Sequence, residues 1–205
     1  DPKWGAYLEW IRTEHPDHFE TALAVAWGTP RMEPPYPDPR YAPGSIRAIR
    51  ERILGPLRQN SPWPLFYESP LPASLHQTTW ITDIALEYLE RRTKESEKQP
   101  FFCQISYVDP HDPYDPPAPY ANMFDADDMP EPLPAAWRER GNAVLDTGRR
   151  WQGFEQIAGD SQAVRQCRAH FHGSVRLIDD QIARIADLLD EQGLWEDTVV
   201  IFTSD

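Results

Sequence analysis

FFCQISYV, residues 101–108, is the stretch on which the fold assignment depends. It is a short run rich in aromatic and β-branched residues, and Pro100 and Pro110 stand on either side of it. Its apolarity is nearly continuous, which is typical of a strand that is buried on both faces of a parallel sheet. We therefore predict a buried parallel strand over residues 101–108.

Helical patterns surround this run. Before it, apolar residues from Trp80 to Leu89 recur at helical spacing, which predicts an amphipathic helix that starts near residue 77. After it, a long helix is predicted from Ser161 to Gly193, followed by a second β-branched run at residues 198–203. This order predicts an α/β fold, with a doubly wound, mostly parallel sheet that is flanked by helices and is incomplete in this chain.

The pattern indicates part of a single domain. We expect an irregular first region, rich in proline and tryptophan, that carries two short helices at residues 4–12 and 45–54. The α/β core portion follows it and contains a long excursion that is too long for a plain connection. The predicted boundaries within 1–205 are 1–75 for the irregular region, 76–205 for the core portion and 109–160 for the excursion.

Charge and composition exclude several functions. The 205 residues have a formal net charge of -13, which repels phosphate backbones, so nucleic acid is not expected as a partner. No stretch approaches the roughly 18 consecutive apolar residues of a membrane span. Cys103 and Cys167 are the only cysteines, and they indicate neither a disulfide framework nor a cysteine-based zinc site.

Candidate site residues follow the two predicted strands, because ligands collect beyond the carboxyl ends of parallel strands. The first segment is DPHDPYDPP, residues 109–117, in which four prolines stiffen a loop that carries His111 and three carboxylates. The second is Ser204 and Asp205, where the chain stops, and we expect that it is an internal piece of a longer protein. At a strand end, Asp205 is well placed to hold a hard divalent cation.

Each candidate also has a structural interpretation. His111 is open to a role as a turn histidine that caps local backbone groups, since a single histidine is not a motif. Asp205 has the alternative of capping a helix N-terminus. His76 precedes the first clear helix, and the sequence gives it no role beyond that of a terminus residue.

Two blocks of the sequence resemble sulfatases of the alkaline phosphatase superfamily, including arylsulfatases and phosphonate monoester hydrolases. The first block is PFF at residues 100–102 with SYVDPHDPY at 106–114, and the second is GSVRLIDDQI at 173–182 with TVVIFTSD at 198–205. The resemblance implies that His111 contacts the sulfate or the leaving oxygen. It implies also that Asp205 ligates a divalent cation, usually Ca²⁺.

The resemblance implies hydrolysis of small-molecule or saccharide sulfate esters by a formylglycine nucleophile made from a C/S-x-P-x-R motif. Neither Cys103 nor Cys167 lies in such a motif, so the nucleophile is expected upstream of this chain, and the chain alone is expected to be inactive. Two alternatives remain open. One is a phosphonate monoesterase or phosphodiesterase of the same superfamily, and the other is a non-catalytic binding protein on the same scaffold.

Overall fold

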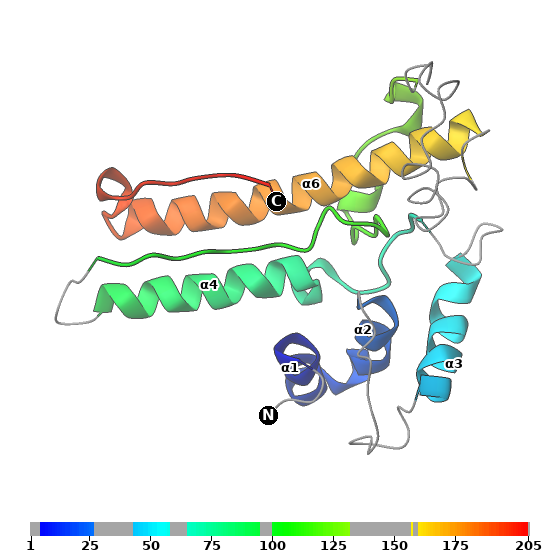
Figure 1. Cartoon of the computed structure of the whole chain (residues 1–205), viewed down its shortest axis with the longest axis horizontal. Coiled ribbons are helices and arrows are strands. Elements are labelled where there is room, and N and C mark those ends of the chain that lie inside the picture. Colours follow the sequence, from blue (N-terminus) through cyan, green and yellow to red (C-terminus); the bar gives the residue numbers. More distant parts are fainter. Residues whose placement is uncertain are drawn as a thin grey trace, which may run out of the picture.

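The computed structural model shows a helical protein in which two long helices run beside each other and three shorter helices lie to one side of them (Figure 1). No helix among the described residues is long and apolar enough to cross a membrane. The residues that the structure describes are 5–26, 43–57, 65–94, 100–131, 157 and 160–204.

The longest helix is α6, Ser161–Glu191, and it packs against α4, Gln77–Lys94. Its first turn is capped by Asp160, whose carboxylate accepts a hydrogen bond of 3.0 Å from the backbone N–H of Ala163. It ends just before Gly193, which has a φ of 64°, a left-handed conformation that glycine adopts without steric cost. The predicted long helix is therefore confirmed.

The predicted helix after residue 77 is also confirmed as α4, but its buried face is narrower and more polar than the apolar spacing indicates. Thr78, Thr82, Ala85 and Leu89 are buried along it, whereas the side chain of Ile84 is 48% exposed. Small and hydroxyl-bearing residues thus face the neighbouring segments. The apolar periodicity correctly predicted the helix, whereas the packing of α4 against its neighbours determines which face of the helix is buried.

The first part of the chain forms a small helical layer with its own hydrophobic core. Its helices are α1 (Ala6–Glu14), α2 (Phe19–Val25) and α3 (Pro43–Leu54). Two of them, α1 and α3, lie close to the two predicted short helices, whereas α2 was not predicted. Ile11 and Leu23 are completely buried in this core. Short 3-10 helices complete the described structure: η1 (Pro16–His18), η3 (Gly55–Leu57), η4 (Ala73–Leu75), η5 (Tyr120–Asn122), η6 (Ala126–Asp128) and η9 (Trp195–Asp197).

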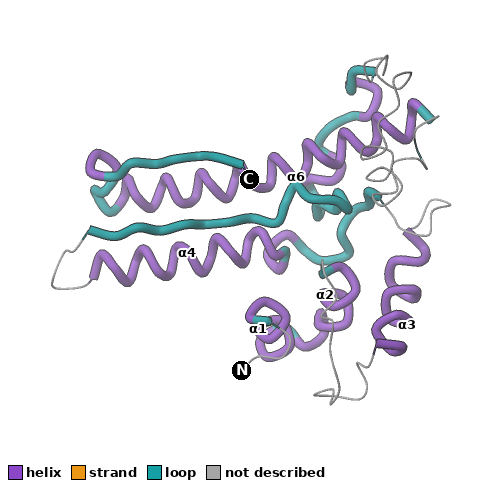
Figure 2. The backbone as a smooth tube through the Cα atoms, viewed as in Figure 1, coloured by secondary structure: helices purple, strands orange, loops and turns teal. Residues whose placement is uncertain are grey.

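The predicted doubly wound parallel sheet is wrong for the described residues, which contain no strand (Figure 2). Residues 101–108 and 198–204 run as extended segments, as their composition indicates (Figure 1), but no backbone among the described residues forms a strand with them. Alternate side chains of residues 101–108 are exposed, with Phe102 at 87%, and residues 199–204 are all exposed, with Phe202 at 81%. A strand requires a hydrogen-bonded partner as well as suitable side chains, and the described part of the chain supplies none.

Candidate functional site

The loop from Asp109 to Asp115 is held at its second end by the segment before α4. The backbone N–H of Tyr114 donates to the carbonyl of Leu65 at 2.8 Å, and that of Tyr67 donates to the carbonyl of Tyr114 at 3.1 Å. These bonds form one of two isolated parallel bridges between the segments. The end of the proline-rich loop is therefore tied to the backbone of a distant part of the chain.

The first end of the loop is held by the start of α4. The hydroxyl of Thr78 donates a hydrogen bond to Oδ2 of Asp109. The same carboxylate oxygen lies 3.6 Å from Nδ1 of His76, and this ring nitrogen accepts a long contact of 3.4 Å from the backbone N–H of Thr78. His76 thus caps the first turn of α4 and also approaches the loop.

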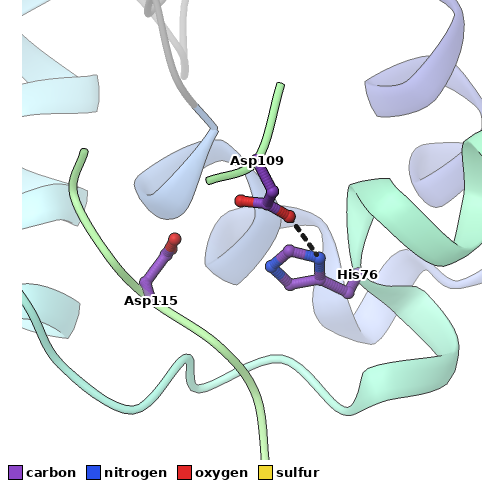
Figure 3. A group of neighbouring side chains, drawn as sticks. All are labelled: His76, Asp109 and Asp115. Carbon is purple, nitrogen blue, oxygen red and sulfur yellow. Dashed lines mark ion pairs between the residues drawn. The ribbon is translucent and has the colours of Figure 1, made fainter. Parts of the chain in front are cut away.

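Asp115 joins His76 and Asp109 in one buried cluster. One ligand atom from each of the three side chains lies within 4.8 Å of the other two. Figure 3 shows the two carboxyl groups and the imidazole directed toward a common space. The hydroxyl of Tyr67 donates a hydrogen bond of 3.0 Å to Oδ2 of Asp115. The cluster therefore connects both ends of the loop with the N-terminus of α4.

Burial and mutual repulsion shape the electrostatics of this cluster. Burial raises the pKa of Asp115 well above its usual value, and the nearby charge of Asp109 raises that pKa further. Burial also lowers the pKa of His76, against the opposing effects of the Asp109 carboxylate and a backbone hydrogen bond with Asp115. The raised pKa of Asp115 and the lowered pKa of His76 both favour the uncharged form of the side chain, in a site that contains two carboxyl groups.

His111 lies in the middle of this anchored loop and is exposed. Its backbone N–H donates to the carbonyl of Val108 at 3.1 Å, and its side chain is 48% exposed. Nδ1 lies 2.7 Å from the backbone carbonyl of Asp112, so a proton on Nδ1 is held there and the neutral ring carries its lone pair on Nε2. His111 lines a pocket of about 40 Å³ together with His76, Asp109 and Asp115.

A larger pocket of about 230 Å³ lies on the other side of Tyr114, against α6. Its aromatic wall includes Tyr114 and Phe171, whose rings meet edge to face with centroids 5.5 Å apart. The complete lining is Tyr114, Ile157, Val164, Cys167, Arg168 and Phe171. Residues of the His111 loop therefore line both pockets, with His111 at the smaller one and Tyr114 at the larger one.

The structure tests the predicted site only in part. His111 is placed in an accessible, anchored loop, but Asp205 lies outside the described residues, so the expected juxtaposition of these two side chains stays a prediction. The sequence reasoning missed His76. The spacing of Asp109 and Asp115 around His111 was a visible signal, but no local pattern connects His76 with this loop.

Two comparisons with known proteins agree with the sequence resemblance. The family model described as "Sulfatase" matches residues 26–205. The chain is 34% identical over 134 residues to an arylsulfatase of Clostridium perfringens (strain 13 / Type A), which covers 64% of this chain and 26% of that protein. It is 36% identical over 149 residues to the multifunctional alkaline phosphatase superfamily protein PehA of Trinickia caryophylli, which covers 67% of this chain and 28% of that protein.

The chain thus spans about a quarter of the length of these relatives. The family match, by contrast, extends over most of the chain, from within the first helical layer to the last residue, and it includes the loop that carries His111. On this evidence the chain belongs to the sulfatase family.

Proposed function

We propose that the protein that contains this chain hydrolyses sulfate esters and that His111 acts on the transferred sulfate or on the leaving oxygen. The observation that carries the proposal is the family match over residues 26–205, within which His111 stands exposed on a loop anchored at both ends. The contact of Nδ1 with the Asp112 carbonyl fixes the orientation of an imidazole, which is a side chain suited to binding an anion or transferring a proton. The expected substrates are small-molecule or saccharide sulfate esters.

In this proposal Asp205 is a ligand of a divalent cation, with Ca²⁺ as the expected ion. A carboxylate is the hard oxygen ligand that Ca²⁺ prefers, and Ser204, the residue before Asp205, is exposed to solvent. A cation there would supply positive charge for the transferring group in a protein whose overall charge is negative.

The nucleophile is proposed to be a formylglycine outside this chain, since Cys103 and Cys167 lie in no C/S-x-P-x-R motif. When present, this group supplies a hydrated aldehyde that attacks sulfur. The contribution of residues 1–205 would then be to bind and orient the anion through His111 and to hold the cation through Asp205. By itself the chain is expected to be inactive.

A second candidate function is phosphonate monoester or phosphodiester hydrolysis. It is favoured by the similarity to a relative that is named as a multifunctional member of the alkaline phosphatase superfamily. A histidine and a cation serve sulfate and phosphate anions alike. A non-catalytic binding protein is the third possibility, because a scaffold does not determine an activity.

The decisive experiment measures turnover of the full-length protein on aryl sulfates, aryl phosphonates and phosphodiesters. We expect His111→Ala to lower kcat by about 10²–10⁴-fold, the range for loss of a general acid or base, with little change in melting temperature. His172→Ala is the matched control, because His172 is also an exposed histidine but lies on α6. Equal loss in both variants, or none in His111→Ala, contradicts the role of His111.

Asp205→Ala tests the cation separately. The variant should lose calcium-dependent hydrolysis of an aryl sulfate, and turnover that remains unchanged counts against Asp205 as a ligand. Turnover only of phosphonates or phosphodiesters by the wild-type protein would select the second candidate. Absence of turnover on all three substrate classes, with retained anion binding, would select the binding protein.

A further inference from the structure

Two hydrogen-bond acceptors face each other in the cluster at the base of the His111 loop. Nδ1 of His76 and Oδ2 of Asp109 are 3.6 Å apart, which is too long for a hydrogen bond. Both atoms already face a donor group of Thr78: Nδ1 accepts the long contact from its N–H, and Oδ2 accepts its hydroxyl. A positively charged group between Nδ1 and Oδ2 would be attracted to both atoms and would replace the long contact that Nδ1 accepts.

No lysine or arginine of the described residues is paired with the carboxylates of the cluster. Within the described ranges, no lysine or arginine forms a salt bridge with Asp109 or Asp115, and the side chains of His76 and Asp109 are only 9% and 11% exposed. Buried carboxylates without a counter-charge are costly, and such groups are normally paired or bound to a metal ion. A proton or a cation has to neutralise the site.

The surroundings of the two carboxylates match the environment of metal ligands. A histidine that binds a metal usually donates its second ring N–H to a carbonyl or carboxylate, and ligating carboxylates are themselves hydrogen-bonded. The imidazole of His76 is held by burial, since its side chain is only 9% exposed. Asp109 accepts the hydroxyl of Thr78, and Asp115 accepts that of Tyr67. Hydrogen bonds from neighbouring hydroxyl groups thus orient both carboxylates.

The dimensions favour a small cation that accepts both nitrogen and oxygen ligands. Around a tetrahedral Zn²⁺ with ligands at about 2.0–2.2 Å, neighbouring ligand atoms are about 3.3–3.6 Å apart. The separation of 3.6 Å between His76 and Asp109 fits this spacing. The adjoining pocket of about 40 Å³ has room for a water molecule as a fourth ligand. Ca²⁺ prefers six to eight oxygen ligands, and an imidazole in the set disfavours it.

We propose that His76, Asp109 and Asp115 form a binding site for a divalent transition-metal ion of the Zn²⁺ type, which fastens the two ends of the loop that carries His111. The bound ion would connect the N-terminus of α4 with both ends of the loop through bonds stronger than the present contacts. The proposal concerns metal binding alone and does not require the protein to hydrolyse sulfate esters.

The test is equilibrium dialysis of the metal-stripped full-length protein against Zn²⁺, with excess Ca²⁺ present to occupy sites built only from oxygen ligands. Metal content is then measured by mass spectrometry. We expect the wild-type protein to bind one Zn²⁺ more than Asp115→Asn and His76→Gln, or to bind it at least tenfold more tightly. Asp112→Asn is the matched control, because it removes the same charge from the same loop, and it should bind as the wild type does.

Two further measurements keep the test independent of how well the variants fold. Zn²⁺ should raise the melting temperature of the wild-type protein and of Asp112→Asn, and Co²⁺ in place of Zn²⁺ should give visible absorption bands in these two proteins. A wild-type protein that takes up no Zn²⁺ under these conditions overturns the proposal. A proton shared within the cluster would then be the group that neutralises the carboxylates. Undiminished Zn²⁺ uptake by folded Asp115→Asn and His76→Gln overturns it as well.

Discussion

Gly173 on α6 provides the sharpest test of how the loop region is packed. A Cβ atom at this position would lie 2.5 Å from the backbone oxygen of Tyr120 and 3.1 Å from Cγ of Pro116. Carbon and oxygen atoms do not approach this closely without displacement, and a backbone oxygen cannot rotate away as a side chain can. We therefore expect that Gly173→Ala pushes α6 away from the segment that follows the His111 loop.

The size of the effect follows from two opposing contributions. Alanine is the better helix former by about 0.8–1.0 kcal/mol, whereas overpacking a close contact costs about 1–3 kcal/mol. Because the closest contact is with backbone, the upper part of that range applies, and the net loss should be about 1–2 kcal/mol. For a chain of this size, each kcal/mol lowers the melting temperature by about 2–4 °C.

The assay is urea unfolding followed by fluorescence of the eight tryptophans, with thermal unfolding as a second probe. Gly44→Ala is the matched control, because Gly44 is exposed near the start of α3 and a Cβ there meets nothing within 4 Å. That variant should be neutral or more stable by up to about 1 kcal/mol. A Gly173→Ala protein as stable as Gly44→Ala would refute the packing of α6 on residues 116–120.

Three further predictions concern individual side chains. Burial raises the pKa of Cys167 to about 12, whereas Cys103 is partly exposed. At pH 8 an alkylating reagent should therefore modify Cys103 well before Cys167. Equal rates of alkylation at the two thiols would contradict the burial of Cys167. Tyr67→Phe removes the hydrogen bond to Asp115 and should lower the free energy of unfolding by about 1–3 kcal/mol, measured by urea titration, whereas an unchanged midpoint would show that the bond contributes nothing. Burial lowers the pKa of His170 below 6.5, so the unfolded chain binds more protons than the folded chain below that pH, and the free energy of unfolding should fall as the solution is acidified. His170→Gln should make the free energy of unfolding less dependent on pH in this range. The same pH dependence in the variant and the wild type would show that other groups cause it.

The helices were predictable because their signals are local. Apolar residues three and four positions apart identified α4 and α6, and Gly193 marked the end of α6. The family could also be recognised from local signals, since the motif around His111 is a continuous run of residues that lies within the family match. Neither inference required knowledge of which segments are neighbours in space.

The sheet and most of the candidate site depend on neighbours. Residues 101–108 have the composition of a strand and are extended, but a strand exists only when a second backbone accepts and donates its hydrogen bonds, and no such partner lies along them in the described structure. The same limit applies to His76. Its capping position at α4 was visible, whereas its approach to Asp109 depends on how α4 is placed against the loop.

The amino-acid sequence by itself determined α1, α3, α4 and α6, the proline-stiffened loop around His111 and the membership of the sulfatase family, because each is encoded in residues that are close together along the chain. Only the tertiary structure decided that the predicted strands stay unpaired and that Asp109, Asp115 and His76 converge in one buried cluster. These features arise from contacts between distant segments, whose free energy depends on burial and hydrogen bonding that no local pattern specifies.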